Sequence, residues 1–380
     1  MATYKEQNKL NVPHLRFPEF QGEWCISTIG EQFNLYSGNT PSRLNKAHFE
    51  GNVNWITSGE LKEHYISDTK EKISEVAATA NNLKLLHPGT FVIAIYGLEA
   101  DGVRGTGSIT CKESTISQAC MAFTQKGDVK NEFLYSWYKK HGNIIGIKYA
   151  QGTKQQNLSY DILEKFHIAY PSQDEQDKLI KFISLLDERI ATQSKLIEKL
   201  ESLIKGIAQK IVRCNKPNVR LSECLECKSS TLQESDVYEQ GTYPVYGANG
   251  IVGYLDNYNT ESEAVYIIKD GSGVGTVSYV TGKCSATGTL NTLQAKDGYS
   301  LQYFYYLLKV FNFEPYKTGM AIPHIYFKDY GNALFFCPSY TEQLQYARLF
   351  FAIDSKLSAE QNIKTNISLQ KQYLLREMFI

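Results

Sequence analysis

Two segments of the chain repeat each other at an offset of 167 residues, and this repeat constrains the fold more than any other feature of the sequence. Residues 152–176 and 319–343 share Gly, Pro, Ser, Glu and Gln in register. In each copy a short apolar stretch, predicted to be a strand, ends at Pro-Ser. The Ser can cap a helix, and the following Glu-Gln can close a capping box. We therefore predict that a strand followed by a long helix occurs twice.

The first of these helices carries residues of a coiled-coil seam at alternating intervals of four and three. Only Gln193 interrupts the apolar pattern, and a polar residue at such a position can fix the register of a coiled coil at some cost in stability. The charged residues between the seam positions are predicted to form a solvated face. The predicted seam positions are Leu179, Ile183, Leu186, Ile190, Gln193, Ile197, Leu200, Ile204, Ile207 and Ile211.

The second helix has a looser apolar stripe that Glu360 interrupts. At ~1.5 Å per residue, a helix of about 40 residues is on the order of 60 Å long, so each helix can serve as a spacer. We predict that the two helices pair antiparallel, with a pseudo-two-fold axis between them. The predicted seam positions of the second helix are Phe350, Ile353, Leu357, Ile363, Ile367 and Leu374.

A globular stretch precedes each helix, and the order of the chain is therefore domain, helix, domain, helix. In each domain an apolar strand, at residues 91–96 and 265–269, leads into a Gly-rich loop, and a helical segment follows at residues 131–138 and 301–308. The expected fold class is α+β, with two α/β domains joined by an antiparallel coiled coil. The predicted boundaries are 1–170 for the first domain, 171–213 for the central helix, 214–337 for the second domain and 338–380 for the C-terminal helix.

The common signatures of catalysis and of metal binding are missing from the sequence. We find no Walker loop, no zinc-protease or esterase motif and no methyltransferase tetrapeptide, so we expect a non-catalytic chain without a cofactor of its own. Cys224 and Cys227 form a C-x-x-C, but no second pair completes a tetrahedral zinc site. The longest apolar runs are too short to span a bilayer and the N-terminus does not resemble a signal peptide, so we expect the chain in the cytoplasm with reduced cysteines.

The charge of the chain argues against nucleic-acid binding when it is taken alone. Lys+Arg and Asp+Glu are equal in number, at 40 each, and residues 214–338 contain 9 basic and 12 acidic side chains. A protein that makes its own phosphate contacts normally has a basic surplus. Two hypotheses follow: a DNA reader whose partner supplies most of the phosphate contacts, or a scaffold whose paired domains bind another protein.

The ordered combination of motifs resembles the specificity subunit of type I restriction-modification enzymes over nearly the whole chain. The matching features are the duplicated domain-helix plan, the Gly-Thr and Pro-Ser-x-x-Glu-Gln junctions, and the segments 37–42, 53–61 and 243–254. The resemblance implies two target-recognition domains, each of which reads one half of a bipartite site in double-stranded DNA. The second repeat departs from the first at residues 323–325, where Pro-His-Ile replaces Gln-Asn-Leu.

The resemblance also implies partners and cofactors. Two methyltransferase subunits would dock on the helices and bind S-adenosylmethionine, and restriction subunits with nuclease and translocase activity would use ATP and Mg. No cofactor is implied for this chain.

Candidate DNA contacts are chosen from side-chain chemistry and loop position. Arg pairs with guanine and Gln with adenine in the major groove, while Ser and Thr mostly contact phosphates. For each residue the alternative is a solvated turn without a function. The candidates are Thr40, Ser42, Arg43, Ser58, Lys62, Arg104, Lys154, Gln155 and Gln156 in the first domain, and Tyr246, Asn249, Lys269, Ser272, Lys283, Lys317 and His324 in the second.

Overall fold

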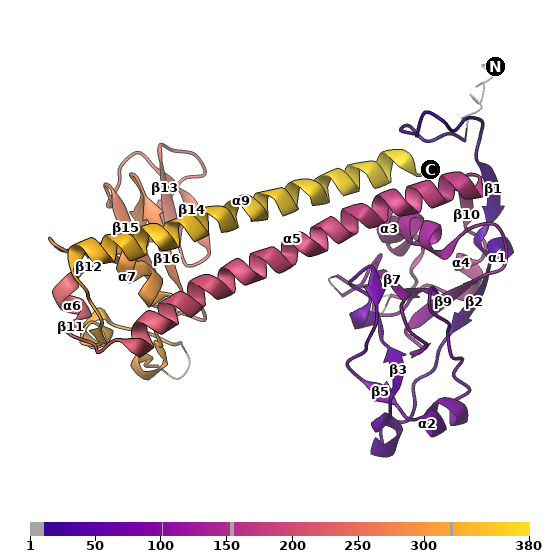
Figure 1. Cartoon of the computed structure of the whole chain (residues 1–380), viewed down its shortest axis with the longest axis horizontal. Coiled ribbons are helices and arrows are strands. Elements are labelled where there is room, and N and C mark those ends of the chain that lie inside the picture. Colours follow the sequence, from indigo (N-terminus) through magenta and orange to yellow (C-terminus); the bar gives the residue numbers. More distant parts are fainter. Residues whose placement is uncertain (1–10, 101, 153–155, 320–321) are drawn as a thin grey trace. The chain divides into compact units, whose positions relative to one another are not determined.

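The computed structural model describes residues 11–100, 102–152, 156–319 and 322–380. The chain divides into two compact units: residues 1–192 with 364–380 form unit 1, and residues 193–363 form unit 2. Two long helices, α5 (Gln173–Cys214) and α9 (Tyr340–Met378), pass through both units (Figure 1). Each unit therefore contains its own part of the helix pair.

Unit 1 is built on a sheet with the strand order β2-β9-β6-β7-β4. Strand β6 lies in the middle and pairs antiparallel with β9 and β7, while the edge strand β4 runs parallel to β7. A smaller sheet has the order β5-β3-β8, and β1 pairs with β10. The strands are β1 (Cys25–Thr28), β2 (Phe33–Ser37), β3 (Val53–Ile56), β4 (Tyr65–Ile66), β5 (Lys72–Ile73), β6 (Phe91–Ala94), β7 (Gly107–Thr110), β8 (Ser114–Ile116), β9 (Cys120–Gln125) and β10 (His167–Tyr170). The helices are α1 (Ile29–Gln32), α2 (Glu75–Ala80), α3 (Asn131–Tyr149) and α4 (Tyr160–Leu163), with 3₁₀ turns η1 (Lys46–Phe49) and η2 (Ser58–Glu60).

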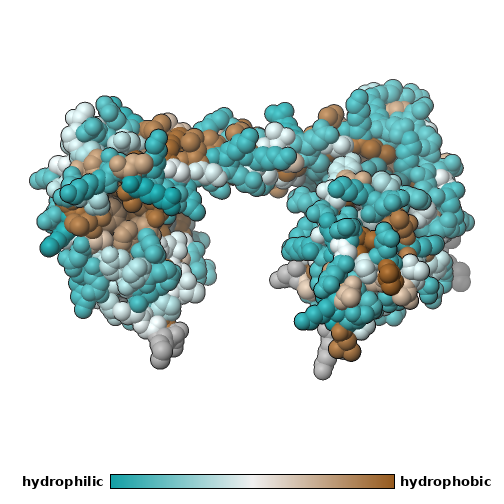
Figure 2. Space-filling model, turned by 60° about the horizontal axis from the view of Figure 1, so that its bottom comes forward, coloured by the Kyte–Doolittle hydropathy of each residue, from teal (hydrophilic) through white to brown (hydrophobic). Residues whose placement is uncertain are grey.

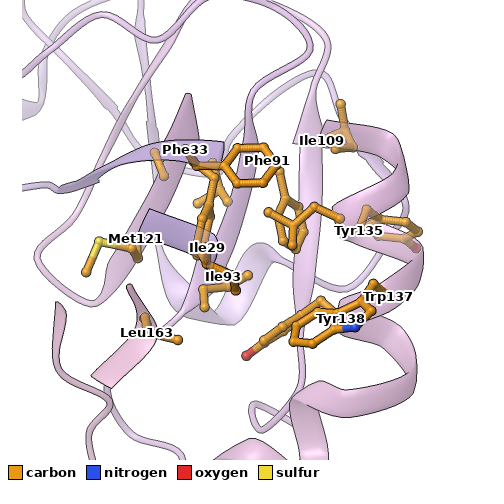
Figure 3. Close-up of a cluster of buried hydrophobic side chains, with 14 of the residues drawn as sticks. Ile29, Phe33, Phe91, Ile93, Ile109, Met121, Tyr135, Trp137, Tyr138 and Leu163 are labelled. Carbon is orange, nitrogen blue, oxygen red and sulfur yellow. The ribbon is translucent and has the colours of Figure 1, made fainter. Parts of the chain in front are cut away.

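The core of unit 1 lies between its larger sheet and α3. All four residues of β6 are buried, which explains why the sequence of this strand is apolar on both faces. Tyr135 and Tyr138 of α3 contact Phe91 of β6 with ring centroids 5.9 and 5.8 Å apart (Figure 3). The predicted helix at residues 131–138 is therefore a core helix, and it continues eleven residues further, to Tyr149.

Unit 2 repeats this plan with a different sheet. Its larger sheet has the antiparallel order β12-β18-β15-β16, its smaller sheet the order β14-β13-β17, and β11 pairs with β19. The strands are β11 (Val219–Arg220), β12 (Leu225–Ser229), β13 (Tyr243–Gly247), β14 (Gly250–Leu255), β15 (Glu263–Ile268), β16 (Val277–Thr281), β17 (Ser285–Ala286), β18 (Leu290–Ala295) and β19 (Leu334–Phe335). The helices are α6 (Leu221–Cys224), α7 (Leu301–Leu308) and α8 (Phe327–Tyr330), with 3₁₀ turns η3 (Glu234–Asp236) and η4 (Glu314–Tyr316).

The contacts of the long helices confirm that they run antiparallel. In unit 1 the beginning of α5 shares a core with the end of α9, as shown by Ile183 and Met378. In unit 2 the later part of α5 shares a core with the beginning of α9, as shown by Ile204 and Phe350. The predicted α+β fold class with an antiparallel helix pair is thereby confirmed. Among the helices of the described ranges, none has an apolar stretch long enough to span a membrane.

One predicted seam position of α9 is wrong. Ile363 is 40% exposed, whereas the other predicted seam residues of both helices are buried or half-buried. The inward stripe of α9 continues from Leu357 through Glu360 to Lys364, in steps of three and four, and Lys364 is half-buried. Hydrophobicity favours Ile363 at this position, but the long stem of the adjacent Lys364 can also cover apolar surface in a helix pair.

The two Pro-Ser junctions attach the long helices to the domains in the same way. In unit 1 the Gln176 side chain donates to the carbonyl of Pro171 and accepts from the backbone N–H of Lys130, which caps α3; both distances are 3.0 Å. In unit 2 the side chain of Gln343 makes the equivalent bonds, to the carbonyl of Pro338 and from the N–H of Ser300, the cap of α7. Each repeated Gln therefore fixes a domain helix to a long helix.

The predicted capping box forms in the second repeat, where Ser339 and Glu342 exchange hydrogen bonds. In the first repeat the carboxylate of Glu175 instead accepts two hydrogen bonds from Arg16, at 2.8 and 2.7 Å. Both side chains of this ion pair are largely buried, at 14% and 2% exposure. Arg16 thereby ties the segment before β1 to the start of α5.

Candidate nucleic-acid interface

The central strand of each unit leads into a Gly-rich loop, and a returning segment pairs with the beginning of that loop. In unit 1 the N–H of Leu98 donates to the carbonyl of Gln156, and Asn157 forms β-bridges with Tyr96 and Gln151. In unit 2 the N–H of Gly271 donates to the carbonyl of Pro323. There His324, 167 residues after Asn157, forms the corresponding bridges with Asp270 and Thr318. We call these two places the loop junctions.

The loop junction of unit 1 brings together two predicted DNA contacts. Arg104 of the Gly-rich loop donates from Nη2 to Oε1 of Gln156 at 2.9 Å. The backbone N–H of Gln156 donates to Glu99 at 2.7 Å, and this bond lowers the pKa of Glu99. The stem of Arg104 lies against Gly146 of α3, where a Cβ would come within 2.5 Å of its Cγ. The stem of Arg104 is therefore held against α3, and its guanidinium is held by Gln156.

The loop junction of unit 2 presents a different polar pair. Nδ1 of His324 lies 2.6 Å from Oδ1 of Asp270, and each side chain is 35% exposed. Lys269 directly precedes Asp270, and Ser272 follows in the Gly-rich turn with an exposed side chain. Lys317, at the other end of the returning segment, is paired with Glu314. Four of the seven predicted contacts of unit 2, namely Lys269, Ser272, Lys317 and His324, thus belong to one group of loops.

The predicted contacts Thr40, Ser42 and Arg43 lie elsewhere in unit 1, in the loop after β2. The guanidinium of Arg43 forms two hydrogen bonds of 2.7 Å with Glu71, and it lies over the ring of Phe49, 4.8 Å from its centroid. Its hydrogen-bonding fork is therefore already occupied within the chain. Guanine binding by Arg43 would have to compete with this ion pair, so Arg43 is a weaker candidate than its residue type indicates.

The other predicted contacts are spread over each unit. Ser58 is half-buried in the turn η2 and Lys62 is exposed just after it. In unit 2, Tyr246 packs against Tyr266 with centroids 5.7 Å apart, Asn249 is exposed in the β13–β14 turn, and Lys283 lies over the ring of Tyr258. Lys154 and Gln155 lie outside the described residues. The structure contains no DNA, and all sixteen contacts stay predictions.

A buried histidine beside Lys62 escaped the sequence analysis. His64 has a carboxylate at each ring nitrogen, Asp187 of α5 and Glu132 of α3, both at 2.9 Å. Its ring is stacked between Tyr65 and Tyr135. Burial disfavours the charged ring, but the hydrogen bonds that the ring donates to the carboxylates of Asp187 and Glu132 outweigh it and raise the pKa of His64. No local pattern could have revealed this cluster, because its acidic partners lie 68 and 123 residues away.

The fold brings the thiol of Cys337 to that of Cys224, the first residue of the C-x-x-C. Burial raises the pKa of Cys224 to about 12 and that of Cys227 to about 11, so both are protonated thiols near neutral pH. Within the described residues, no group of three or more His, Cys, Asp or Glu side chains could hold a metal ion.

Comparison with known proteins gives the family. The model of the type I restriction modification DNA specificity domain matches residues 21–202 and 216–369. The chain belongs to this family. It carries two copies of the domain, and the match supports the resemblance that the motifs indicated.

Two curated relatives show the extent of the similarity. The chain is 27% identical over 185 residues to the MjaIX specificity subunit of Methanocaldococcus jannaschii. The aligned region covers 48% of this chain and 42% of that relative. It is 23% identical over 372 residues to the EcoprrI specificity subunit of Escherichia coli, and this aligned region covers 88% of each of the two chains. The chain spans less than half of the length of the MjaIX and MjaVIII relatives.

A solved structure shows the same fold. The crystal structure of a type I restriction-modification S subunit from M. genitalium superposes with a TM-score of 0.67 at 19% sequence identity, covering 97% of this chain and 99% of that one.

Proposed function

We propose that this chain is the DNA-reading subunit of a type I restriction-modification complex, in which each unit recognises one half of a bipartite site and the chain itself performs no catalysis. The observation that carries this proposal is the pair of loop junctions. The same backbone arrangement presents Arg104 with Gln156 in unit 1 and Asp270 with His324 in unit 2. Recognition of two different half-sites requires a repeated framework with different polar side chains.

The chemistry of these side chains suits base edges. Arg104 can donate to guanine and the amide of Gln156 can both donate and accept, while His324 carries a second ring nitrogen besides the one at Asp270. Exposed Lys62 and the lysines of unit 2 can contact phosphates, which positions a reader without specifying sequence.

The exposed apolar residues of the long helices support a role in assembly. Figure 2 shows hydrophobic patches on these helices between hydrophilic residues. The exposed apolar residues of α5 and α9 include Leu185, Leu203, Leu349, Phe351 and Leu369, which are between 46% and 58% exposed. Patches of this kind mark sites of protein–protein contact. We propose that they dock two methyltransferase subunits and that restriction subunits join the complex.

The cofactors follow from this division of labour. S-adenosylmethionine would bind to the methyltransferase subunits, and ATP and Mg to the restriction subunits, while this chain would bind none. One solved structure of similar fold, with a TM-score of 0.55 at 15% identity, is described as showing complex assembly and conformational transition of the type I R-M system. Reading chromosomal and invading DNA would place the assembled complex in the cytoplasm.

A second candidate function is a scaffold that binds protein through both units. The net acidic charge of residues 214–338 favours it, as do the internal ion pairs of Arg43 and Lys317. The two functions differ in what they bind.

Selection of bound sites from a random duplex library, with the chain in complex with its methyltransferase partner, tests the proposal. A DNA reader enriches two short sequences at a fixed separation, and a scaffold enriches none. Because the chain alone has no net charge, we expect it to bind DNA weakly, and we expect the complex to show a steep decrease of affinity with salt concentration. Tight sequence-specific binding by the lone chain would contradict the assignment of the phosphate contacts to the partner.

A further inference from the structure

Asp270 and His324 form a hydrogen-bonded pair at the loop junction of unit 2, and the proposed function gives Asp270 no role. Two hydrogen bonds of 2.8 Å to Thr318 hold the backbone of His324 on one side, and the Asp270 bridge holds it on the other. These contacts fix the backbone of His324 but leave the orientation of its ring undetermined. The 2.6 Å hydrogen bond between Nδ1 and Asp270 fixes the orientation of the ring.

The bond also selects the tautomer of the ring. An ionised carboxylate only accepts hydrogen bonds, so Nδ1 of His324 must carry the proton that it shares with Asp270. A neutral ring then has an unprotonated Nε2, on the side of the ring away from Asp270, that can only accept. In the major groove the groups that donate are the amino groups of adenine and cytosine.

A purely structural role for this pair is poorly supported. Both side chains are 35% exposed, so water competes for the hydrogen bond between them and the pair contributes little to stability. The equivalent position of unit 1 makes the same backbone bridges with Asn157 and without any histidine, so the backbone arrangement does not depend on the pair. In unit 1 the polar pair at this junction is Arg104–Gln156 instead. The framework is shared, and what differs between the units is the side chains.

We propose that Asp270 is a positioning residue for base recognition: it holds His324 so that Nε2 accepts a hydrogen bond from the amino group of an adenine or a cytosine in the half-site read by unit 2. This inference rests on the proposed function. It adds a role for Asp270 and a defined class of base for His324.

The test is site selection with the complex of chain and methyltransferase partner, on the wild type and four variants. Asp270→Ala and His324→Ala should each lose about three- to tenfold of the preference at the same single position of one half-site, the range expected for one hydrogen bond. Asp270→Asn should retain most of it, because Oδ1 of Asn can still accept from Nδ1. Asp256→Ala removes the same charge from unit 2 at an exposed side chain bonded to Thr242, and it should leave the preference unchanged.

Three results would overturn the inference. An unchanged preference for Asp270→Ala, beside a loss for His324→Ala, would remove the positioning role. An unchanged preference for His324→Ala would remove the base contact. Every base pair has an adenine or a cytosine on one strand, so the tautomer is tested with base analogues: unchanged preference when that adenine is replaced by purine, or that cytosine by 2-pyrimidinone, each without the exocyclic amino group, would rule out the assigned tautomer. The other half-site, read by unit 1, is the internal control for folding. Absence of any enriched site for the wild type would refute the proposed function instead.

Discussion

Replacement of His64 tests whether a buried cation holds unit 1 together. His64 makes hydrogen bonds to the carboxylates of Asp187 and Glu132, and hydrogen bonds to charged groups contribute roughly 1.5–3 kcal/mol each. His64→Gln can preserve one of these bonds at most, so we expect the free energy of unfolding of unit 1 to fall by about 2 kcal/mol. His64→Leu loses both bonds, but Asp187 keeps its ion pair with Lys371 and only Glu132 loses its charged partner, so we expect a loss of about 3 kcal/mol.

The loss should depend on pH with a definite sign. Both ring nitrogens face acceptors, so the folded state favours the doubly protonated ring, and the pKa of His64 is raised above its ordinary value of 6.5. The stabilisation is then complete below about pH 6.5 and disappears as the pH rises through the folded-state pKa. Over that interval the difference between the wild type and His64→Gln should shrink by about 1.4 kcal/mol per pH unit.

Tryptophan fluorescence during urea unfolding measures this effect in unit 1 alone, because all three tryptophans of the chain, Trp24, Trp55 and Trp137, belong to unit 1. His87→Gln is the matched control: this histidine is exposed and lies 3.9 Å from Glu113, so its loss should change little at any pH. A difference between wild type and His64→Gln that stays constant from about pH 6 to pH 9 would refute the charged form of His64.

Three further substitutions test other parts of unit 1. Burial, with nearby Lys371, lowers the pKa of Lys139 to about 8, so Lys139→Met should stabilise unit 1 at pH 7 by about 1–3 kcal/mol and abolish the gain in stability expected between about pH 8 and pH 10, as measured by urea unfolding. Arg16→Met should cost about 3–5 kcal/mol because it leaves Glu175 buried and unpaired, and the double variant with Glu175→Met should regain most of that loss in the same assay. Gly146→Ala should displace the stem of Arg104 and weaken the preference at one position of the half-site read by unit 1 about three- to tenfold in site selection, while the other half-site serves as the unaffected control.

Local patterns sufficed to predict the elements whose signal lies within a few neighbouring residues. The Pro-Ser junctions, the long helices and the buried strand at residues 91–94 follow from capping, from the alternation of three and four and from continuous apolar sequence. The error at Ile363 shows the limit of this reasoning. Periodicity identifies the face of a helix, but the choice between Ile363 and Lys364 depends on which position the partner helix covers.

The candidate site was less predictable because its residues acquire their roles from distant partners. Residue type and loop position select Arg104 and Gln156 as two separate candidates, and it is the fold that pairs them across 52 residues. The same reasoning chose Arg43, which the fold pairs with Glu71. Asp270 was overlooked because an acidic residue is a poor candidate for a DNA contact until its bond to His324 is known.

The repeat offset also predicts one long-range contact, which the periodicity of the single helices does not show. Gln193 and Glu360 each interrupt the apolar stripe of one long helix, and they are 167 residues apart, which is the offset of the repeat. In the structure the amide of Gln193 donates a hydrogen bond to the carboxylate of Glu360. In two repeated helices that pair antiparallel, equivalent residues lie opposite each other at one position only, the midpoint of the pairing. An apolar stripe interrupted in both helices at the repeat offset therefore identifies Glu360 as the partner of Gln193.

The chemistry of this pair predicts how it responds to exchange. Hydrogen bonds from Lys356 and from Gln193 lower the pKa of Glu360, so the carboxylate is ionised and needs donors around it. Gln193→Glu would place a second carboxylate against it and should lower the melting temperature at neutral pH, with partial recovery on acidification as one carboxyl group takes up a proton. Glu360→Gln keeps a neutral amide pair and should be tolerated. Helix content measured by circular dichroism during heating distinguishes the variants. Equal melting temperatures for Gln193→Glu and Glu360→Gln at neutral pH would show that this contact does not discriminate between an amide and a carboxylate.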